Sequence, residues 1–271
     1  MTVLLHISDT HFGTEEPAVV AALRKLAHEQ KPQVLVLSGD ITQRARSAQF
    51  AAARAFCDSL QIPNVLTLPG NHDIPLYNLA ARVFYPYAGY TRAFGDELEP
   101  ELEVDGLLVI GVNTTRPHRR KDGAVSARQV NRVVKRLHTA RRDQLRLVVT
   151  HQPACVMRSE DEKDRLHGGE VAVQSWARAG ADLVLGGHIH LPYVSDLCAR
   201  AKATPRALYC VQAGTAVSHR VRHGTPNTVN MIRWTPPAPD QPRMVRVERW
   251  DYDLADDRFE ESKGQELVLG E

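Results

Sequence analysis

Cysteine is scarce in this sequence: four residues in a chain of 271, all far apart. Cys57, Cys155, Cys198 and Cys210 show no Cys-x-x-Cys spacing, which excludes a thiolate zinc site of the usual kind and a disulfide-rich scaffold. We therefore expect all four to be reduced thiols in a reducing compartment.

The chain also lacks an excess charge, a long apolar run and a leader. Its 34 Lys and Arg against 32 Asp and Glu leave a net charge of +2, so nucleic acid is not an expected partner. No apolar stretch approaches the roughly 20 residues that span a bilayer, which excludes a transmembrane helix. The first apolar run starts at Val3 without a basic leader, and we expect a soluble, cytoplasmic protein.

Short apolar runs alternate with amphipathic segments in the first half of the chain. The runs at 3–7, 34–37 and 65–68 predict buried strands. Helices are expected between them, one from about Glu15 and one capped by Ser47. This order predicts parallel βαβ units whose polar loops share one edge of a sheet.

Beyond these units the alternation continues and then gives way to β structure. A hairpin is expected at 101–112 with Asp105-Gly106 as its turn. It is followed by helices and strands at 126–140, 145–149, 168–179 and 183–185, and then by strands at 193–197, 206–211, 227–234 and 243–250. We expect one α/β domain over residues 1–271, with a core at about 3–217, a β-rich part at about 218–254 and a weakly defined polar tail at 255–271.

Polar motifs stand where the predicted strands end, which is the sheet edge that binds ligands in α/β proteins. Gly70-Asn71-His72-Asp73 follows the strand at 65–68, and Pro69-Gly70 allows the backbone a tight turn there. The other motifs are Asp9-Thr10-His11, Gly39-Asp40, His151 and Gly187-His188-Ile189-His190. Together they predict a metal site with seven candidate ligands: Asp9, His11, Asp40, Asn71, His151, His188 and His190.

Mixed imidazole, carboxylate and amide ligands suit Mn, Fe, Zn or Ni rather than Mg or Ca, and we favour Mn or Fe. Seven ligands are too many for one ion, whereas two ions about 3.5–4 Å apart use them naturally. Asp40 is the expected bridge between the two. Such a pair of ions would lower the pKa of a bridging water to give hydroxide and would clamp two phosphoryl oxygens, which predicts hydrolysis by in-line attack.

His72 is adjacent to Asn71 and is the candidate general acid or transition-state donor. We expect Asp73 to hydrogen-bond its ring and favour the protonated form.

Two further segments have open interpretations. The aromatic stretch 74–99 is either a loop and short helix pinned by its rings or a wall that faces the substrate. The basic loop 116–121 is either solvated surface or a contact for a substrate phosphate.

The ordered set Asp9-x-His11, Gly39-Asp40, Gly70-Asn71-His72-Asp73, His151 and Gly187-His188-x-His190 resembles the calcineurin-like metallophosphoesterase superfamily over about residues 3–217. The resemblance implies a four-layer α/β/β/α sandwich. It also implies one metal held by Asp9, His11, Asp40 and His190, a second held by Asp40, Asn71, His151 and His188, and His72 as the conserved acid.

Within the superfamily the pattern looks most similar to the bacterial class III cyclic-nucleotide phosphodiesterase-like branch. UDP-diacylglucosamine hydrolases carry Arg where this chain has His72, and repair nucleases bring longer nucleic-acid-binding additions. Ala213-Gly214-Thr215 with Arg220 and Arg222 resembles the loop after the last metal block of this branch. Arg220 and Arg222 are candidates to hold a phosphate oxygen, with solvated turn residues as the alternative, and Asn113 is a third substrate-binding candidate.

These observations predict a dinuclear metal-dependent phosphodiesterase acting on a small phosphate ester, with 3′,5′-cyclic nucleotides as first candidates. A phosphomonoesterase or nuclease using the same metals is the second hypothesis. A catalytically idle scaffold that keeps the fold is a third.

Overall fold

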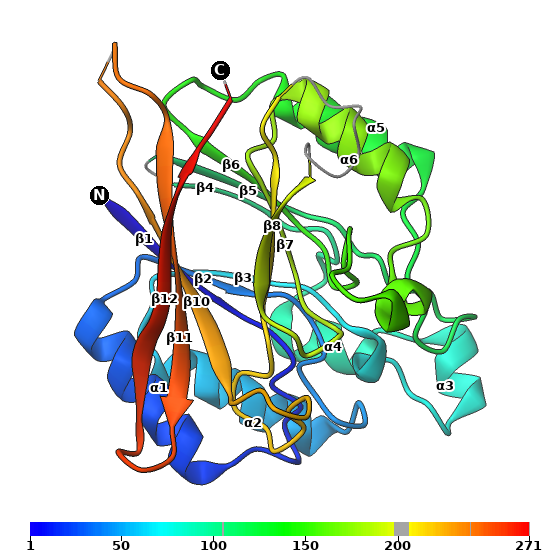
Figure 1. Cartoon of the computed structure of the whole chain (residues 1–271). Helices are drawn as coiled ribbons and strands as arrows, with labels where there is room; N and C mark the ends of the chain where they lie inside the picture. Colours follow the sequence, from blue (N-terminus) through cyan, green and yellow to red (C-terminus); the bar gives the residue numbers. More distant parts are fainter. Residues whose placement is uncertain (105, 198–205, 239, 271) are drawn as a thin grey trace.

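Two six-stranded sheets form the centre of the protein (Figure 1). The computed structural model describes residues 1–104, 106–197, 206–238 and 240–270. The first sheet has the order β12-β11-β10-β1-β2-β3, made of Arg258–Val268, Met244–Asp253, Thr228–Trp234, Thr2–Ile7, Val34–Leu37 and Asn64–Thr67. The second has the order β4-β5-β6-β7-β9-β8, made of Glu101–Val104, Leu107–Gly111, Leu145–Val149, Leu183–Gly186, Tyr209–Gln212 and Tyr193–Asp196.

Strands β1, β2 and β3 are parallel, as are β5, β6, β7 and β9, so each sheet has a set of carboxyl ends on one side. Both faces of most of these strands are buried, which explains their continuous apolar runs, whereas β3 begins with the half-buried Asn64 and the exposed Val65. In β1, for example, Leu5 and Ile7 point into one hydrophobic cluster while Leu4 points into another.

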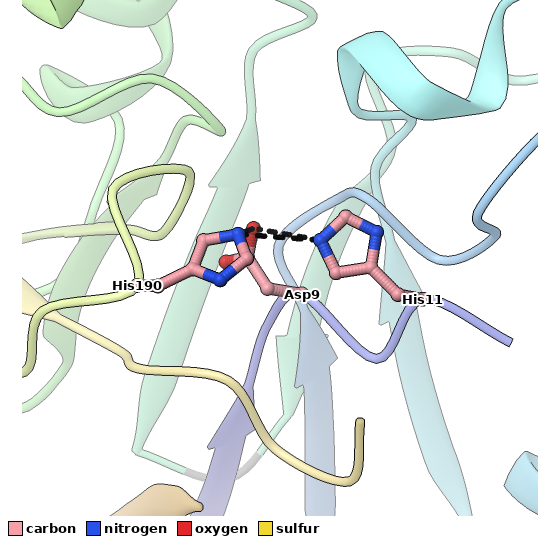
Figure 2. Close-up of side chains that lie close together, drawn as sticks. All are labelled: Asp9, His11 and His190. Carbon is pink, nitrogen blue, oxygen red and sulfur yellow. Dashed lines mark hydrogen bonds and ion pairs between the residues drawn. The ribbon is translucent and has the colours of Figure 1, made fainter. Parts of the chain in front are cut away.

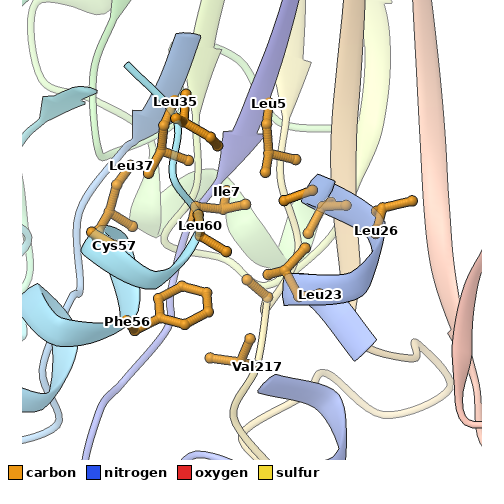
Figure 3. Close-up of a cluster of buried hydrophobic side chains, with 14 of the residues drawn as sticks. Leu5, Ile7, Leu23, Leu26, Leu35, Leu37, Phe56, Cys57, Leu60 and Val217 are labelled. Atoms are coloured by element: carbon orange, nitrogen blue, oxygen red, sulfur yellow. The ribbon is translucent and has the colours of Figure 1, made fainter. Parts of the chain in front are cut away.

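Helices cover the outer face of each sheet. On the first sheet, α1 (Pro17–Gln30) and α2 (Ser47–Ser59) pack Leu23 and Phe56 against Ile7 (Figure 3). On the second, α5 (Ala127–Leu137) and α6 (Gly169–Ala179) pack over its apolar side chains. A third cluster, between the sheets, contains residues of both. The expected α/β/β/α sandwich is therefore confirmed.

The short elements lie in the connections. They are η1 (Asn71–Asp73), α3 (Leu79–Phe84), α4 (Ala88–Phe94) and η2 (Ser159–Asp164). Among the helices in the described ranges, none combines the length and the apolar character needed to cross a membrane.

Three local predictions concern the cap of α2, the cysteines and the hairpin β4–β5. Ser47 is the first residue of α2 and not its cap, which is Arg46. Cys57 and Cys210 are free thiols, as expected, Cys155 contacts Cys210, and Cys198 lies outside the described residues. The hairpin β4–β5 forms as predicted, although Asp105 of its turn also lies outside them.

The prediction of a weakly defined tail from residue 255 is wrong. Residues 258–268 form β12, which pairs along its length with β11 and makes one edge of the first sheet. Phe259 and Leu267 are buried, whereas most side chains between them are exposed. This strand is polar because charged residues protect a sheet edge from pairing with other chains, so it lacks an apolar run.

Leu267→Ala is expected to lower the free energy of unfolding by about 2–3 kcal/mol, because Leu267 is 7% exposed and packs between the sheets. The matched control is its neighbour Val268, which is 55% exposed and should cost under about 0.5 kcal/mol when replaced by alanine. Urea unfolding of both variants measures the difference. Equal, small losses would mean that the C-terminal strand is not packed in solution.

Candidate metal centre

Polar loops from both sheets meet at one end of the sandwich. Asp9 and His11 follow β1, Asp40 follows β2 and Asn71 follows β3, while His151 and His188 follow β6 and β7 of the other sheet. The amide of His188 donates to Asp9 Oδ2 over 2.9 Å, and His151 Nε2 lies 3.3 Å from Asp40 Oδ1. Side chains from both sheets therefore form one cluster.

The first group of side chains is Asp9, His11 and His190 (Figure 2). His11 Nε2 and His190 Nε2 are 3.2 Å apart, and Asp9 Oδ1 is 3.3 Å from His190 Nε2 and 3.8 Å from His11 Nε2. Asp9 is fully buried, and Oδ1 has no hydrogen-bond partner among the described residues. A buried carboxylate oxygen without a donor is costly unless a cation binds it, so this group fits a metal ion.

The second group is Asp40, His151 and His188, with Asn71 beside it. Asn71 Oδ1 is 3.3 Å from His151 Nε2. Asp40 also lies 3.9 Å from His11 Nε2 of the first group. It therefore stands between the two groups, where a ligand shared by two ions would lie.

Hydrogen bonds turn the correct imidazole nitrogen toward the cluster. His151 Nδ1 lies 2.8 Å from the carbonyl oxygen of Ser38, which can only accept, so Nδ1 carries the proton. His190 Nδ1 likewise contacts the carbonyl of Arg220. In the neutral ring, Nε2 then has its lone pair free for a metal, which is the usual outer support of a metal-binding histidine.

Burial and the attraction between carboxylates and imidazoles shift the pKa values of the candidate ligands. The pKa of Asp9 is held below its usual range, since His190 and His151 outweigh its burial. Burial outweighs the nearby carboxylates at two rings and lowers the pKa of His11 to about 3 and that of His188 to about 4. Against burial, Asp40 raises the pKa of His151 to about 9 and Asp9 raises the pKa of His190, so a metal that binds these two rings must displace a proton. Ionised carboxylates and neutral imidazoles are the forms that bind metals.

The backbone is strained at most of these positions. Five of the seven predicted ligands have positive φ: Asp9 (52°), His11 (44°), Asp40 (48°), His188 (74°) and His190 (56°). Each such residue costs about 1–3 kcal/mol relative to relaxed backbone, and such strain collects at functional sites.

Two glycines make room for the cluster. A β-carbon on Gly70 would lie 2.0 Å from the amide nitrogen of Asp40, and one on Gly187 would lie 2.4 Å from Asp9 Oδ2. The predicted need for glycine in these motifs thus has a steric cause.

The predicted contact between Asp73 and the ring of His72 is wrong. The 3-10 turn η1 points the carboxylate of Asp73 inward, where it accepts from Gly70, Ile41 and Thr42. Burial and Asp40 raise the pKa of Asp73 to about 6, against the effect of these hydrogen bonds. Asp73 is therefore a residue that positions the backbone.

His72 remains at the site. Its amide donates to Asp40 Oδ1 over 2.8 Å, and its Nδ1 donates to the carbonyl of Gln43 over 3.1 Å. Its ring centroid lies 4.8 Å from that of His11.

The cluster opens into a cavity of about 340 Å³. Arg220 and Arg222 both line it, but Arg222 is ion-paired with Asp161 at 2.9 Å and with Glu160. Lys121 of the basic loop 116–121 also lines it, which fits the second interpretation of that loop. Sequence reasoning missed Asp161 and Asp164, because they come from a distant loop.

The structure does not bring Asn113 into this cavity. Its Oδ1 accepts from Thr115, and Asn113 lines a separate cavity with Glu99 and Arg132. Its prediction as a substrate-binding residue is therefore wrong, because its side chain binds Thr115 and lines the other cavity.

Two rings of the aromatic segment support the fold, whereas Tyr77, Phe84 and Tyr85 are exposed. Tyr90 is buried and bonded to Thr67, and Tyr87 bonds to Thr115, so these rings pin the segment to the sheets.

Comparison with known proteins agrees with this geometry. A glycerophosphodiester phosphodiesterase, GpdQ of Enterobacter lignolyticus, is 34% identical over 84 residues, covering 26% of this chain and 29% of that protein. A probable cyclic nucleotide phosphodiesterase of Synechococcus sp. is 25% identical over 169 residues, covering 61% of each. The chain thus spans less than two thirds of the length of either relative.

Solved structures share the fold at low identity. A dimetal phosphatase from Danio rerio superposes with a TM-score of 0.66 at 12% identity, covering 99% of both chains. Purple acid phosphatase PPD1 of yellow lupin gives a TM-score of 0.68 at 11% identity, covering 98% of this chain and 53% of that one. The profile of the calcineurin-like phosphoesterases matches residues 2–192, and the chain belongs to this family.

Proposed function

We propose that this protein is a dinuclear metal-dependent phosphoesterase that hydrolyses a phosphodiester bond of a small substrate, with 3′,5′-cyclic nucleotides as first candidates. The main support is Asp9 Oδ1, which is buried beside two imidazole nitrogens and accepts no hydrogen bond from the described residues, together with Asp40 between the two groups. Both relatives are named as phosphodiesterases, which favours a diester over a monoester as the substrate.

The proposed ligands of one ion are Asp9, His11, Asp40 and His190, and those of the other are Asp40, Asn71, His151 and His188, with Mn or Fe favoured. Two ions bound there would activate water and neutralise charge on phosphoryl oxygens.

His72 is the proposed proton donor. Its Nδ1 is already committed to the carbonyl of Gln43, so in the charged ring the proton on Nε2 is available to the leaving oxygen. Arg220 lines the cavity and is held by Gln43 Oε1 at 2.6 Å, which suits it to orient a non-bridging phosphate oxygen. Arg222 is already neutralised by two carboxylates, so we propose that it holds the 159–164 wall and contributes less to substrate binding.

Hydrolysis of bis(p-nitrophenyl) phosphate, measured with Mn²⁺ and after chelation, tests the proposal. We expect turnover with metal and its loss without. Parallel assays with cyclic nucleotides, nucleoside monophosphates and single-stranded DNA separate the diesterase from the monoesterase and the nuclease. Metal-replete protein without activity on any ester would instead support the idle scaffold.

His72→Ala is expected to lower kcat by about 10²-fold while two metals per chain are retained, because the ring is proposed to supply a proton and not a lone pair. Steady-state kinetics and elemental analysis measure the two effects. His138→Ala, at the exposed end of α5, is the control and should change neither. Loss of a metal from His72→Ala would assign the ring to the ligands.

We also propose that residues 1–271 form one domain in the cytoplasm. Support comes from the cluster between the sheets, which contains both Leu4 and Leu269, and from the free thiols of Cys57 and Cys210.

A further inference from the structure

A second cavity, of about 330 Å³, adjoins the metal centre. Both cavities are lined by Asn71, His72 and Lys121, so His72 stands where they meet. The apolar side chains of Ile74 and Leu76 also line the second cavity. A group bonded to a phosphorus atom at the metal centre can therefore extend past His72 into a partly apolar space.

The charge of this second cavity is positive. Arg44, Arg120 and Lys121 line it, and none of its described lining residues is Asp or Glu. Lys121 pairs with Asp164 at 2.7 Å, but in the described ranges neither Arg44 nor Arg120 forms an ion pair with a carboxylate. Arg44 instead lies over the ring of Tyr77, 5.8 Å from its centroid. The guanidinium groups of Arg44 and Arg120 are therefore available to bind an anion.

The backbone that carries these cations is anchored. Arg82, 9% exposed, donates to the carbonyl of Arg119 over 2.7 Å and to that of Pro75 over 3.1 Å, which ties the basic loop to the opposite wall. Gln152 donates to the carbonyl of Lys121 over 3.0 Å. The backbone on both sides of Arg120 is thus fixed before a ligand arrives, which lowers the entropy lost on binding.

We propose that this cavity is a subsite for a leaving alcohol that carries a second phosphate. The inference rests on the proposed function and specifies a substrate other than a 3′,5′-cyclic nucleotide, which has only one phosphate: a phosphodiester with a phosphorylated alcohol on the His72 side. A guanidinium group can donate two parallel hydrogen bonds to the oxygens of one phosphate. The apolar Ile74 and Leu76 can pack against the carbon skeleton between the two phosphates. In the reaction, water forms a bond to the diester phosphorus, the bond to the alcohol oxygen breaks, that oxygen gains a proton, and the second phosphate is unchanged.

Binding of a matched pair of nucleotides tests the subsite without turnover. Thymidine 3′,5′-bisphosphate and thymidine 5′-monophosphate differ only in the phosphate that would enter the second cavity. By calorimetry on the metal-replete protein, we expect the bisphosphate to bind at least about 10-fold more tightly, and the preference to shrink at high salt.

The double variant Arg44→Met, Arg120→Met removes both charges and keeps an unbranched, flexible side chain at each position. It should bring the ratio of the two dissociation constants close to 1, whereas Arg24→Met, on the exposed face of α1, should leave the ratio unchanged. A wild-type ratio near 1, or a ratio that survives in the double variant, would overturn the subsite.

Kinetics provide a second readout. Thymidylyl-(3′→5′)-thymidine with a terminal 3′-phosphate should have a kcat/KM at least about 10-fold above the unphosphorylated dinucleotide, and the double variant should remove the difference. The two proposals fail separately: absence of hydrolysis of bis(p-nitrophenyl) phosphate contradicts the proposed function, whereas equal binding of the two nucleotides contradicts only the subsite.

Discussion

Asp40→Asn is expected to lower kcat/KM for bis(p-nitrophenyl) phosphate by about 10³-fold or more and to reduce the metal content to one ion or fewer per chain. Asp40 lies between the two groups of candidate ligands, 3.3 Å from His151 and 3.9 Å from His11. An amide has one oxygen and no charge, so it cannot serve both groups. Elemental analysis and steady-state kinetics on the same samples measure the two effects.

Asparagine is the right replacement because Asp40 has φ 48°, in the left-handed region that Asn tolerates and Ala does not. The variant therefore changes the charge and leaves the backbone alone. Asp58→Asn, at an exposed ion pair on α2, is the control and should retain full activity. If Asp40→Asn kept two metals and normal turnover, the shared-ligand arrangement would be wrong.

Asp73→Ala is expected to cost about 4 kcal/mol of unfolding free energy, the largest stability effect we predict. The side chain is fully buried and accepts four hydrogen bonds, from the amides of Gly70, Ile41 and Thr42 and from Thr42 Oγ1. Removing it leaves several buried donors without partners, at about 1–3 kcal/mol each before relaxation. Urea unfolding measures the loss.

Asp73→Asn retains one acceptor oxygen and should cost about half as much. Asp256→Ala, at an exposed carboxylate paired with Arg258, should change stability by less than about 0.5 kcal/mol. Because the bonds of Asp73 tie the turn after β2 to the turn after β3, we also expect weaker metal binding in Asp73→Ala. If Asp73→Ala were as stable as the wild type but had a lower kcat, the result would instead support the hydrogen bond between Asp73 and the ring of His72 that was predicted from the sequence.

The sequence was sufficient to predict the position of the candidate ligands along the chain but not all of their contacts. Asp9, Asp40 and Asn71 follow apolar strands, and parallel strands bring such residues to one edge. Their approach to His151 depends on the packing of two sheets, which the family resemblance implied and the hydrophobic pattern alone did not.

The adjacency of Asp73 and His72 in the sequence led to a wrong prediction of contact between them, since a single 3-10 turn is enough to point neighbouring side chains in different directions. The pairing of Arg222 with Asp161 joins residues 61 positions apart, for which the sequence has no local signal. The strand β12 was not predicted because only Phe259 and Leu267 of this edge strand are buried, and the residues between them are mostly charged or polar, so the sequence shows no apolar alternation.

The left-handed backbone at Asp9, His11, Asp40, His188 and His190 limits how this centre can be redesigned. Exchanging ligands is the usual route to a different metal preference. A β-branched or bulky residue at any of these five positions, however, would strain the backbone there whether or not a metal is bound. A library built to alter metal choice would therefore do better to keep Asp, Asn, His and Gly there and vary the hydrogen-bonding partners behind them, such as Thr215 behind His190.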